Sequence, residues 1–595
     1  MAKVNIKING QEMAVEQGMT ILQAAQTAGI YIPTLCYHPD LALHGVCRIC
    51  SVEVKGQRTL SASCAYPVSE GMDILTNSLK VRDARKMIVE LLLANHPQEC
   101  LICAKNQSCE LQKFAKELGI QEVRFKGERR NYEIDNSSPS VIRDQDKCIL
   151  CGRCVRTCQD IQSVGALHVA DRGWNSMIVA GMGGDLADAV CVNCGQCINR
   201  CPTGALKGND PAPAIWDAIH DPSKHVIVQT APAVRASIGE EFGMEPGSRV
   251  TKKMVTALRM LGFNKVFDTD FTADLTIMEE GSELIERVTN GGVLPQITSC
   301  SPGWIKFIEY YYPELLPHLS SCKSPQQMFG ALAKTYYAQK NGIDPASIVS
   351  VSIMPCVAKK FECDRPEMYS SGYKDVDYVL TTREAAGMMH EAGIDLPNLE
   401  DSEFDAPFGI TTGAAVIFGN TGGVMEAALR TAYALITGKE LDNVNIEAVR
   451  GMEGVREATI QVGDLPVKAA VAHGLANARE VLEGIKSGRF ADYAFIEIMC
   501  CPGGCIGGGG QPQPTNAEIR AKRIAGIYAE DGAMELRKSH ESPTVKAIYE
   551  EFLGKPLSHK SHELLHTTYT PRSRKTVKSE RSAVSSESGK KVKVD

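Results

Sequence analysis

The sequence predicts an α/β multidomain protein in which metal-binding segments come first and a two-lobed α/β body follows. Three observations lead to this prediction. At roughly 150 residues per domain, a chain of 595 residues suggests about four domains. Most of its 22 cysteines fall into tight groups in the first 210 residues. From about Lys224 onward, short apolar strands and amphipathic helices replace the cysteine groups.

The composition argues against several classes of protein. A net charge of -7 is small for this length and does not favour nucleic acid as a partner. We expect no export signal, because no apolar run follows the first basic residue, and no membrane span, because no stretch approaches the ~18 apolar residues a span requires. The expected location is the cytoplasm. Since disulfide scaffolds are usually small and secreted, the crowded cysteines favour metal ligation by zinc or iron–sulfur clusters.

The first predicted domain covers residues 1–78. Val4, Ile6 and Ile8 alternate before Asn9-Gly10, a strong hairpin signal, and a helix is expected from Thr20 to about Ala28. The cysteines that follow have the spacing C-x10-C-x2-C-x13-C, namely Cys36, Cys47, Cys50 and Cys64. A close pair with two returning thiolates suits a two-iron cluster, with structural zinc as the alternative. This spacing resembles the [2Fe–2S] domain of the large peripheral subunit of complex I and of many [FeFe]-hydrogenases, which implies a β-grasp fold.

A second segment, residues 79–138, has the pattern H-x3-C-x2-C-x5-C, formed by His96, Cys100, Cys103 and Cys109. Three cysteines cannot close a four-iron site alone, so His96 is the candidate fourth ligand. An ordinary surface histidine is the alternative. The placement directly after the two-iron domain resembles the His-ligated [4Fe–4S] segment of the same families. A neutral imidazole in place of a thiolate would raise the reduction potential of that cluster.

The third segment, residues 139–212, contains two C-x2-C-x2-C-x3-C runs, the second followed by proline. This is the bacterial two-cluster ferredoxin pattern, in which the fourth cysteine of each run ligates the other cluster. Zinc is a poor alternative here. One [4Fe–4S] cluster is therefore assigned to Cys148, Cys151, Cys154 and Cys201, and the other to Cys191, Cys194, Cys197 and Cys158.

The expected catalytic body is residues 220–512. Residues 225–229 form an apolar strand and 251–261 an amphipathic helix, and no nucleotide loop or nucleophile elbow is present in the sequence. Three stretches resemble the signature motifs of the [FeFe]-hydrogenase catalytic domain, as do APAVR at 231–235 and TADLTIMEE at 272–280. The three are TSCSPGW at 298–304, MPCVAK at 354–359, and EIMCCPGGC at 497–505 with GGGGQP at 507–512.

The resemblance implies a six-iron active site, the H-cluster, in which a cysteine joins a [4Fe–4S] cube to a diiron unit with carbonyl, cyanide and azadithiolate. By position, Cys356, Cys501 and Cys505 would bind the cube, and Cys505 would be the bridge. Lys359 would donate to a cyanide, with Pro232, Met354 and Met499 beside the diiron unit. Core filling is the ordinary alternative for the two methionines.

The first motif departs from the family pattern. The family has two adjacent cysteines, of which the first relays protons and the second binds the cube, whereas this chain has Cys300 followed by Ser301. The residue count places Cys300 at the relay position. Thiolate chemistry instead favours Cys300 as the cube ligand, because a serine hydroxyl binds iron poorly. Cys300 is assigned both roles.

Heterolytic cleavage of dihydrogen requires a base with a buried route to solvent. On the helix expected around 277–288, Glu280 lies on the apolar stripe formed by Ile277, Leu284 and Val288, with Glu283 at i+3. Position for position, Glu280, Ser320 and Glu283 match the family's proton path; a solvated helix face is the alternative. The remaining cysteines, Cys322, Cys363 and Cys500, are expected to be small buried hydrophobes with no ligation.

After the catalytic body, residues 513–569 resemble the C-terminal helical segment of the same family. Residues 570–595 are rich in serine, lysine and arginine, and we expect a disordered tail.

The sequence thus predicts a hydrogenase that passes electrons along three accessory [4Fe–4S] clusters and one [2Fe–2S] cluster. The expected partners are the flavin- and NAD(P)-binding and small [2Fe–2S] subunits of a multimeric complex, or ferredoxin. The alternatives are a homologue that only transfers electrons, and one that has lost the diiron unit and serves as a dihydrogen sensor or in iron–sulfur assembly.

Overall fold

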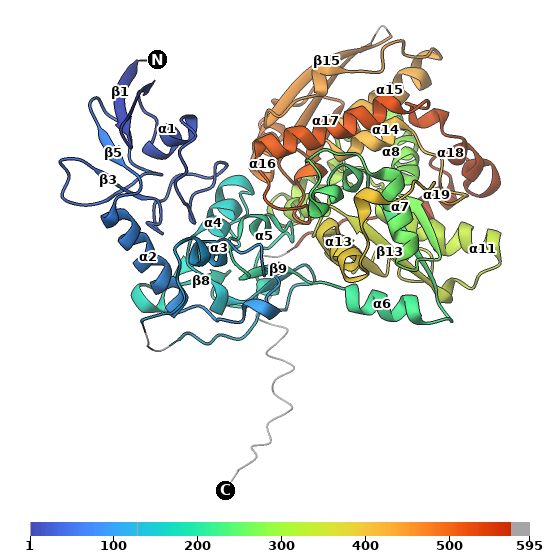
Figure 1. The fold of residues 1–595 in the computed structure, drawn as a ribbon. Coiled ribbons are helices and arrows are strands. Elements are labelled where there is room, and N and C mark those ends of the chain that lie inside the picture. Colours follow the sequence, from blue (N-terminus) through green and yellow to red (C-terminus); the bar gives the residue numbers. More distant parts are fainter. Residues whose placement is uncertain (1, 126, 128, 464, 573–595) are drawn as a thin grey trace. The chain divides into compact units, whose positions relative to one another are not determined.

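The computed structural model describes residues 2–125, 127, 129–463 and 465–572. The chain divides into two compact units (Figure 1). The N-terminal unit comprises Met1–Ile161, Gly165–Leu186 and Arg200–Lys207. The C-terminal unit comprises Gln162–Val164, Ala187–Asn199 and Gly208–Asp595. Each unit is described by itself.

The N-terminal unit begins with a five-stranded sheet in the order β2-β1-β5-β3-β4 and one helix. The expected hairpin is present, with positive φ at Asn9 (52°) and Gly10 (89°) between the first two strands. The expected helix begins where Thr20 and Gln23 form a capping box. The alternating residues Val4, Ile6 and Ile8 face the core that also contains Cys50 and Cys64. The elements are β1 (Lys3–Ile8), β2 (Gln11–Glu16), α1 (Ile21–Thr27), β3 (Ser51–Val54), β4 (Ser61–Ala62) and β5 (Asp73–Leu75).

Short elements joined by long loops make up the rest of the cysteine-rich region. Two strand pairs, β6 with β9 and β7 with β8, accompany them. Most of the cysteines lie on loops or in short turns, where the backbone can bend around a cluster, whereas Cys154 lies in α4 and Cys197 in α5. The elements are α2 (Leu79–Ala94), α3 (Glu110–Glu117), β6 (Val141–Arg143), α4 (Arg153–Arg156), β7 (Leu167–Ala170), β8 (Met177–Ala180), α5 (Gln196–Arg200) and β9 (Leu206–Gly208).

The C-terminal unit contains two four-stranded sheets, which agrees with the expected two-lobed α/β body. The first, β11-β10-β13-β14, is parallel throughout. The second, β12-β17-β16-β15, is parallel except for the antiparallel pair β15–β16. The strands are β10 (His225–Thr230), β11 (Lys265–Asp268), β12 (Gln296–Ile297), β13 (Ile348–Met354), β14 (Tyr378–Thr381), β15 (Val455–Val462), β16 (Leu465–His473) and β17 (Phe495–Met499).

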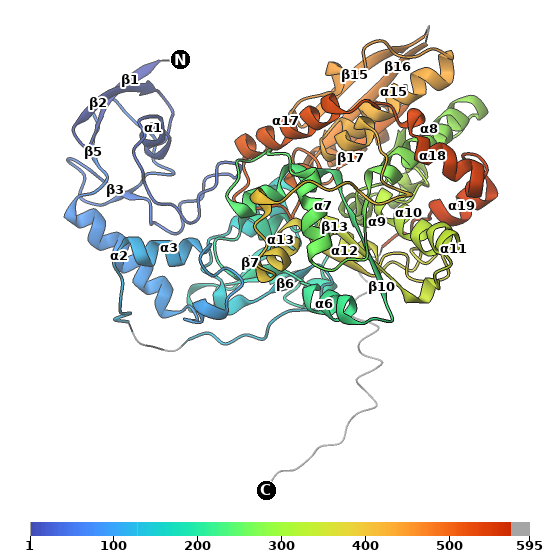
Figure 2. The ribbon, with the colours of Figure 1, turned by 45° about the vertical axis from the view of Figure 1, so that its right-hand side comes forward.

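Helices cover both sheets. Along β10, Val226 and Val228 pack into one core and Ile227 into another, as period-two alternation requires of a strand buried on both faces. Figures 1 and 2 show α15 and α17 beside the second sheet, where Leu429 and Ile527 pack against strand residues. The helices are α6 (Ala212–His220), α7 (Thr251–Met260), α8 (Asp270–Asn290), α9 (Pro302–Tyr311), α10 (Pro325–Leu332), α11 (Ala338–Asn341), α12 (Lys359–Glu362), α13 (Thr382–Glu391), α14 (Gly413–Val416), α15 (Gly423–Thr437), α16 (Leu475–Lys486), α17 (Ala517–Ala533), α18 (Pro543–Ile548) and α19 (His559–Leu565).

Two expectations about helices and termini need correction. Val288 was placed on the buried stripe of its helix, but it is 53% exposed because the last turns of α8 extend beyond the core. The tail was expected to start at 570, yet Arg572 donates from Nε to the buried Glu309 carboxylate at 2.6 Å. The rest of the predicted tail, 573–595, lies outside the described residues. In the part of the chain that the structure describes, no helix combines the length and apolar character needed to cross a membrane.

Candidate metal centres and buried cavity

The four cysteines of the first group converge in the N-terminal unit. Cys36 interacts through its thiol with Cys47 and Cys64, and Cys50 with Cys64. The Cys36 backbone N–H also points to the Cys47 Sγ at 3.4 Å. Hydrogen bonds from Cys47 and Cys64 lower the pKa of Cys36, and one from Cys64 lowers the pKa of Cys50 to about 6, whereas the same contacts, together with burial, raise the pKa of Cys47 and of Cys64. Since thiolates are the metal-binding form, this convergent donor set fits a two-iron cluster.

His96 lines a pocket with Cys100, Cys103 and Cys109. Its Nδ1 lies 3.0 Å from the Pro97 carbonyl oxygen, whereas its buried Nε2 has no hydrogen-bond partner among the described residues. Burial, with the charge of Lys147, lowers the pKa of His96 to about 4. The imidazole is therefore neutral at pH 7, and the Pro97 contact fixes the proton on Nδ1. An unpartnered buried nitrogen with a free lone pair fits a metal ligand.

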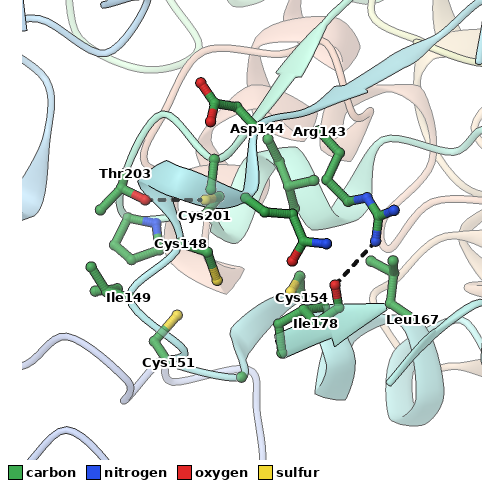
Figure 3. A pocket seen from close by; sticks show the side chains of 15 residues that line it. Arg143, Asp144, Cys148, Ile149, Cys151, Cys154, Leu167, Ile178, Cys201 and Thr203 are labelled. Carbon is green, nitrogen blue, oxygen red and sulfur yellow. Dashed lines mark hydrogen bonds between the residues drawn. The ribbon is translucent and has the colours of Figure 1, made fainter. Parts of the chain in front are cut away.

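A second pocket in the N-terminal unit is lined by Cys148, Cys151, Cys154 and Cys201, as Figure 3 shows. Cys201 is the fourth cysteine of the second run, yet it lines the same pocket as three cysteines of the first run. The predicted pattern, in which the fourth cysteine of each run ligates the other cluster, requires this position. The Leu150 N–H points to Cys148 Sγ at 3.4 Å, which the positive φ of Leu150 allows. Burial raises the pKa of Cys148 to about 11. A cation in the pocket would reverse that effect and favour the thiolates.

The loop of the second run repeats this geometry in the C-terminal unit. The Asn193 N–H points to the Cys191 Sγ at 3.4 Å, and Asn193 has a φ of 59°. Cys194 and Cys197 follow on the same loop. Cys158 belongs to the N-terminal unit, so its assignment to this cluster stays a prediction.

The three signature motifs meet at the carboxyl ends of parallel strands in the C-terminal unit. β10 and β13 of the first sheet lead into Pro232 and Cys356, and β12 and β17 of the second lead into Cys300 and Cys501. Strand ends from both sheets surround a cavity of about 70 Å³. Ligand sites in parallel α/β sheets are found at this edge. The lining includes Ala231, Pro232, Thr269, Ala273, Cys300, Met354, Cys356, Lys359, Phe418, Met499 and Cys505.

The cavity lining fits an anionic iron cluster bound by thiolates. Cys356 and Cys505 supply soft donors, and the Cys501 thiol lies close enough to influence the pKa of both. The lining residues include the cation Lys359, whose Nζ donates to the Cys300 carbonyl at 3.1 Å and to Glu362 at 2.8 Å. Pro232, Met354 and Met499 form apolar walls, as the resemblance leads us to expect.

The structure separates the two residues that the sequence could not assign. Cys300 lines the cavity together with Met354, Met499 and Lys359. Ser301 is the N-cap residue of α9, and its hydroxyl accepts a hydrogen bond from the Cys500 N–H at 3.4 Å. Cys300 therefore faces the cavity, together with Cys356 and Cys505, whereas the Ser301 hydroxyl lies beside the Cys500 backbone.

Glu280, Ser320 and Glu283, three residues predicted for the proton path, contact one another in that order. Glu280, only 3% exposed, forms a side-chain hydrogen bond with Ser320, and the Ser320 hydroxyl donates to Glu283 at 2.8 Å. Burial, reinforced by the charge of Glu283, raises the pKa of Glu280 to about 8. Glu283 pairs with Arg287 at 2.7 Å, where both side chains have partial access to solvent. The Glu280 charge also acts on the Cys300 thiol at the cavity.

Sequence reasoning missed three residues around this path. Ser321 donates its N–H to Glu283 at 3.1 Å, and its hydroxyl lies 2.8 Å from Nδ1 of His566 in the C-terminal segment. Glu279, which the helical pattern placed on another face, is fully buried and accepts a hydrogen bond from Tyr549 at 2.6 Å. No local pattern could have shown these contacts, since nearly 250 residues separate Ser321 from His566.

Glu497 of the third motif fixes the strand end that leads into the cavity. Its buried carboxylate accepts from the Gly422 N–H at 2.6 Å and from the Met425 N–H at 2.8 Å, at the N-terminus of α15. This carboxylate satisfies amides that have no partner within the helix.

We expect Glu497→Leu to lower the melting temperature of the protein by several degrees. The change leaves two buried amides without their acceptor, at about 1–3 kcal/mol each, and about 1 kcal/mol shifts a domain of this size by roughly 2–4 °C. Differential scanning calorimetry measures the shift. Glu245→Leu, at a side chain 85% exposed, is the control and should leave the transition unchanged. Equal transitions for the two variants would contradict the assigned role of Glu497.

Models of known protein families match most of the chain. The C-terminal domain of the iron only hydrogenase large subunit matches residues 224–509, and the iron hydrogenase small subunit matches 517–572. Before them, a 2Fe-2S iron-sulfur cluster binding domain matches 1–78, the NADH-ubiquinone oxidoreductase-G iron-sulfur binding region matches 85–124, and a 4Fe-4S dicluster domain matches 147–205.

Similar proteins cover nearly the whole chain. NADP-reducing hydrogenase subunit HndD of Solidesulfovibrio fructosivorans is 51% identical, over 96% of this chain and 100% of the relative. Iron hydrogenase 1 of Clostridium pasteurianum is 41% identical over 95% of this chain and 99% of its own. Among solved structures, apo [FeFe]-hydrogenase HydA1 from Chlamydomonas reinhardtii is 44% identical with a TM-score of 0.55, covering 61% of this chain and 99% of that one.

Proposed function

Because this chain belongs to the iron-only hydrogenase family and is an enzyme of that class, we propose that it interconverts dihydrogen with protons and electrons in the cavity of the C-terminal unit. The observation that supports this proposal most directly is the line of proton-binding groups from the cavity towards solvent. Cys300, Glu280, Ser320 and Glu283 occupy that line in order. A chain that only transfers electrons has no use for such a path.

The cavity residues would hold the six-iron H-cluster. Cys356, Cys501 and Cys505 would bind its cube, and Lys359, Pro232, Met354 and Met499 would lie beside the diiron part. When bound, the cluster supplies the metal at which dihydrogen is split or formed. The protein supplies the proton transfer and keeps bulk water away from the reacting site.

The proton steps follow from the contacts. In the direction of oxidation, the Cys300 thiol passes its own proton to a carboxylate oxygen of Glu280 and takes up a new proton from the cavity, because burial raises its pKa and keeps it a neutral thiol. The Ser320 hydroxyl then donates to Glu283 and is reprotonated from Glu280, so that the proton leaves where Glu283 meets solvent. A carboxyl with a pKa of about 8 suits this role, because it can both take up and release a proton near neutral pH.

The cysteine groups in the first 210 residues of the sequence support an electron path. We propose one [2Fe–2S] and three [4Fe–4S] accessory clusters, bound by the ligands assigned from the spacing. The convergent thiols of the first group, the unpartnered Nε2 of His96 and the pocket around Cys201 all support this assignment.

We further propose that the chain is the catalytic subunit of a multimeric NAD(P)-linked hydrogenase. The relative at 51% identity is named as a subunit of an NADP-reducing hydrogenase. The partners would be flavin- and NAD(P)-binding and small [2Fe–2S] subunits, and coupling to NAD(P) would place the enzyme in the cytoplasm. Purification from the native source tests this: co-purifying flavin subunits support it, whereas an active, flavin-free monomer that reduces ferredoxin contradicts it.

The test of the catalytic proposal is an infrared spectrum of the protein after anaerobic maturation with the diiron cofactor. We expect carbonyl and cyanide stretching bands that change under dihydrogen, together with dye-linked turnover. Assembly of the cubes without such bands would refute the proposal and favour an electron-transfer or sensing role.

We expect His96→Cys to lower the reduction potential of its cluster by on the order of 100 mV or more. A thiolate adds negative charge to the cluster, which makes uptake of a further electron less favourable than with a neutral imidazole. An electron paramagnetic resonance titration of the full chain measures the change. His559→Cys, at an exposed histidine, is the control. An unchanged potential with full iron content would show that His96 is not a ligand.

A further inference from the structure

The cube expected beside the cavity lacks one protein thiolate. Cys356, Cys501 and Cys505 supply three, and the fourth position of the family pattern is occupied by Ser301. A serine hydroxyl is a hard, weakly acidic donor, whereas iron–sulfur cubes bind soft thiolates. Cys300 also lines the cavity, together with Cys356 and Cys505. The proposed function uses Cys300 as the proton relay, so the cube must take its fourth thiolate from another cysteine.

Cys500 lies where the missing thiolate is needed. It follows β17 directly, next to Cys501, and is 3% exposed. Its backbone N–H donates to the Ser301 hydroxyl at 3.4 Å. Its Sγ rests against the turn of the first motif, since a Cβ added to Gly303 would lie 2.7 Å from that sulfur. The Cys500 thiol thus occupies the space between the Ser301 turn and Cys501.

The partners of Cys500 differ from those of the other two cysteines that the sequence left unassigned. The Cys363 thiol donates to the Lys360 carbonyl at 3.2 Å, and the Cys322 thiol faces the Glu283 carboxylate at 4.0 Å. Both have oxygen partners, as buried structural cysteines usually do. The Cys500 thiol instead interacts with two thiols, those of Cys501 and Cys194, and its sulfur accepts from Nε2 of Gln162 at 4.0 Å. Three sulfurs from two predicted cluster sites meet at this point.

We propose that Cys500 supplies the fourth thiolate of the cube in place of Ser301, and that Ser301 holds the Cys500 backbone in position through its hydroxyl. The proposal rests on the proposed function, because it assumes a cube in this part of the chain. Cys500 is not needed as a ligand of the ferredoxin-type cluster, because that cluster already has four predicted cysteines, including Cys194. With this assignment each of the two cubes has four thiolates.

The assignment also gives electrons a short route. Cys194 is a predicted ligand of the ferredoxin-type cluster in the same unit, and its thiol contacts that of Cys500. If both sulfurs bind iron, adjacent ligands of two clusters touch directly. Electrons would then pass between the accessory chain and the catalytic site through one sulfur–sulfur contact.

The experiment uses the full chain produced without diiron maturation, so that the cube is measured apart from catalysis. Iron content and the electron paramagnetic resonance spectrum of the reduced protein are recorded for Cys500→Ala, for Ser301→Cys/Cys500→Ala and for Cys363→Ala. We expect Cys500→Ala to lose about four irons per chain and one cube signal, with the other cluster signals retained. The double variant should regain both, because it restores a thiolate at the family position, and Cys363→Ala should resemble the unchanged protein.

Two results would overturn the proposal: full iron content with an intact cube signal in Cys500→Ala, or no recovery in the double variant. Infrared spectra after maturation distinguish failure of the ligand assignment from failure of the hydrogenase proposal. If the unchanged protein and the double variant hold the cube but never show carbonyl and cyanide bands, the hydrogenase proposal fails while the ligand assignment stands.

Discussion

Replacing Glu280 by glutamine should slow dihydrogen oxidation by on the order of 10²–10⁴-fold, the usual contribution of a general acid or base. Glutamine keeps the shape of the side chain, but its amide cannot take up and release the transferred proton. Glu280 is the carboxylate between the cavity and Ser320, and its pKa of about 8 lets it do both. The variant should retain its infrared bands, because Glu280 is not among the residues that line the cavity.

The rate is measured as dye-linked dihydrogen uptake by the matured full chain. Glu286→Gln is the matched control, since Glu286 is on the same helix but is exposed. An unchanged rate in Glu280→Gln would show that protons leave by another route. The hydrogen bonds from Ser321 to Glu283 and to His566 indicate where to search for that route.

Replacing Cys300 by alanine should reduce turnover by a similar 10²–10⁴-fold while the protein keeps its full iron content. Alanine removes the thiol that faces the cavity and ends proton transfer at its first step. The cube should survive, because we propose that Cys500 supplies its fourth thiolate, beside Cys356, Cys501 and Cys505. In this variant turnover should therefore fall while the cluster content stays unchanged.

Iron analysis, infrared spectra and dye-linked uptake of Cys300→Ala check the prediction, with Cys363→Ala as a control for loss of a buried thiol. Loss of the cube in Cys300→Ala would reverse the assignment and make Cys300 the ligand. Together with Cys500→Ala, which should lose the cube, the variant separates proton relay from ligation within one site.

The sequence was sufficient for features that depend on short spacing. Two residues between cysteines leave little freedom in a loop, so the groups at Cys148 and Cys191 predicted clusters without tertiary information. The first hairpin and helix were also predictable, because Asn9-Gly10 and the Thr20–Gln23 capping box act within a few residues. The strand at 225–229 and the helix at 277–288 lie within β10 and α8, and the helix expected at 251–261 corresponds to α7, which ends at Met260.

The sequence alone did not determine which of Cys300 and Ser301 faces the cavity, nor the position of Cys500. These depend on the pairing of β12 with β17 in the second sheet and on the cavity where those strand ends meet the end of β13 from the first sheet, which brings together motifs separated by 50 to 200 residues. The contact of His566 with Ser321 has the same origin. A local pattern specifies which metal-binding and proton-binding side chains the chain contains. The packing of the two sheets decides which of these side chains meet, because long-range contacts, and not spacing along the chain, set the distances between them.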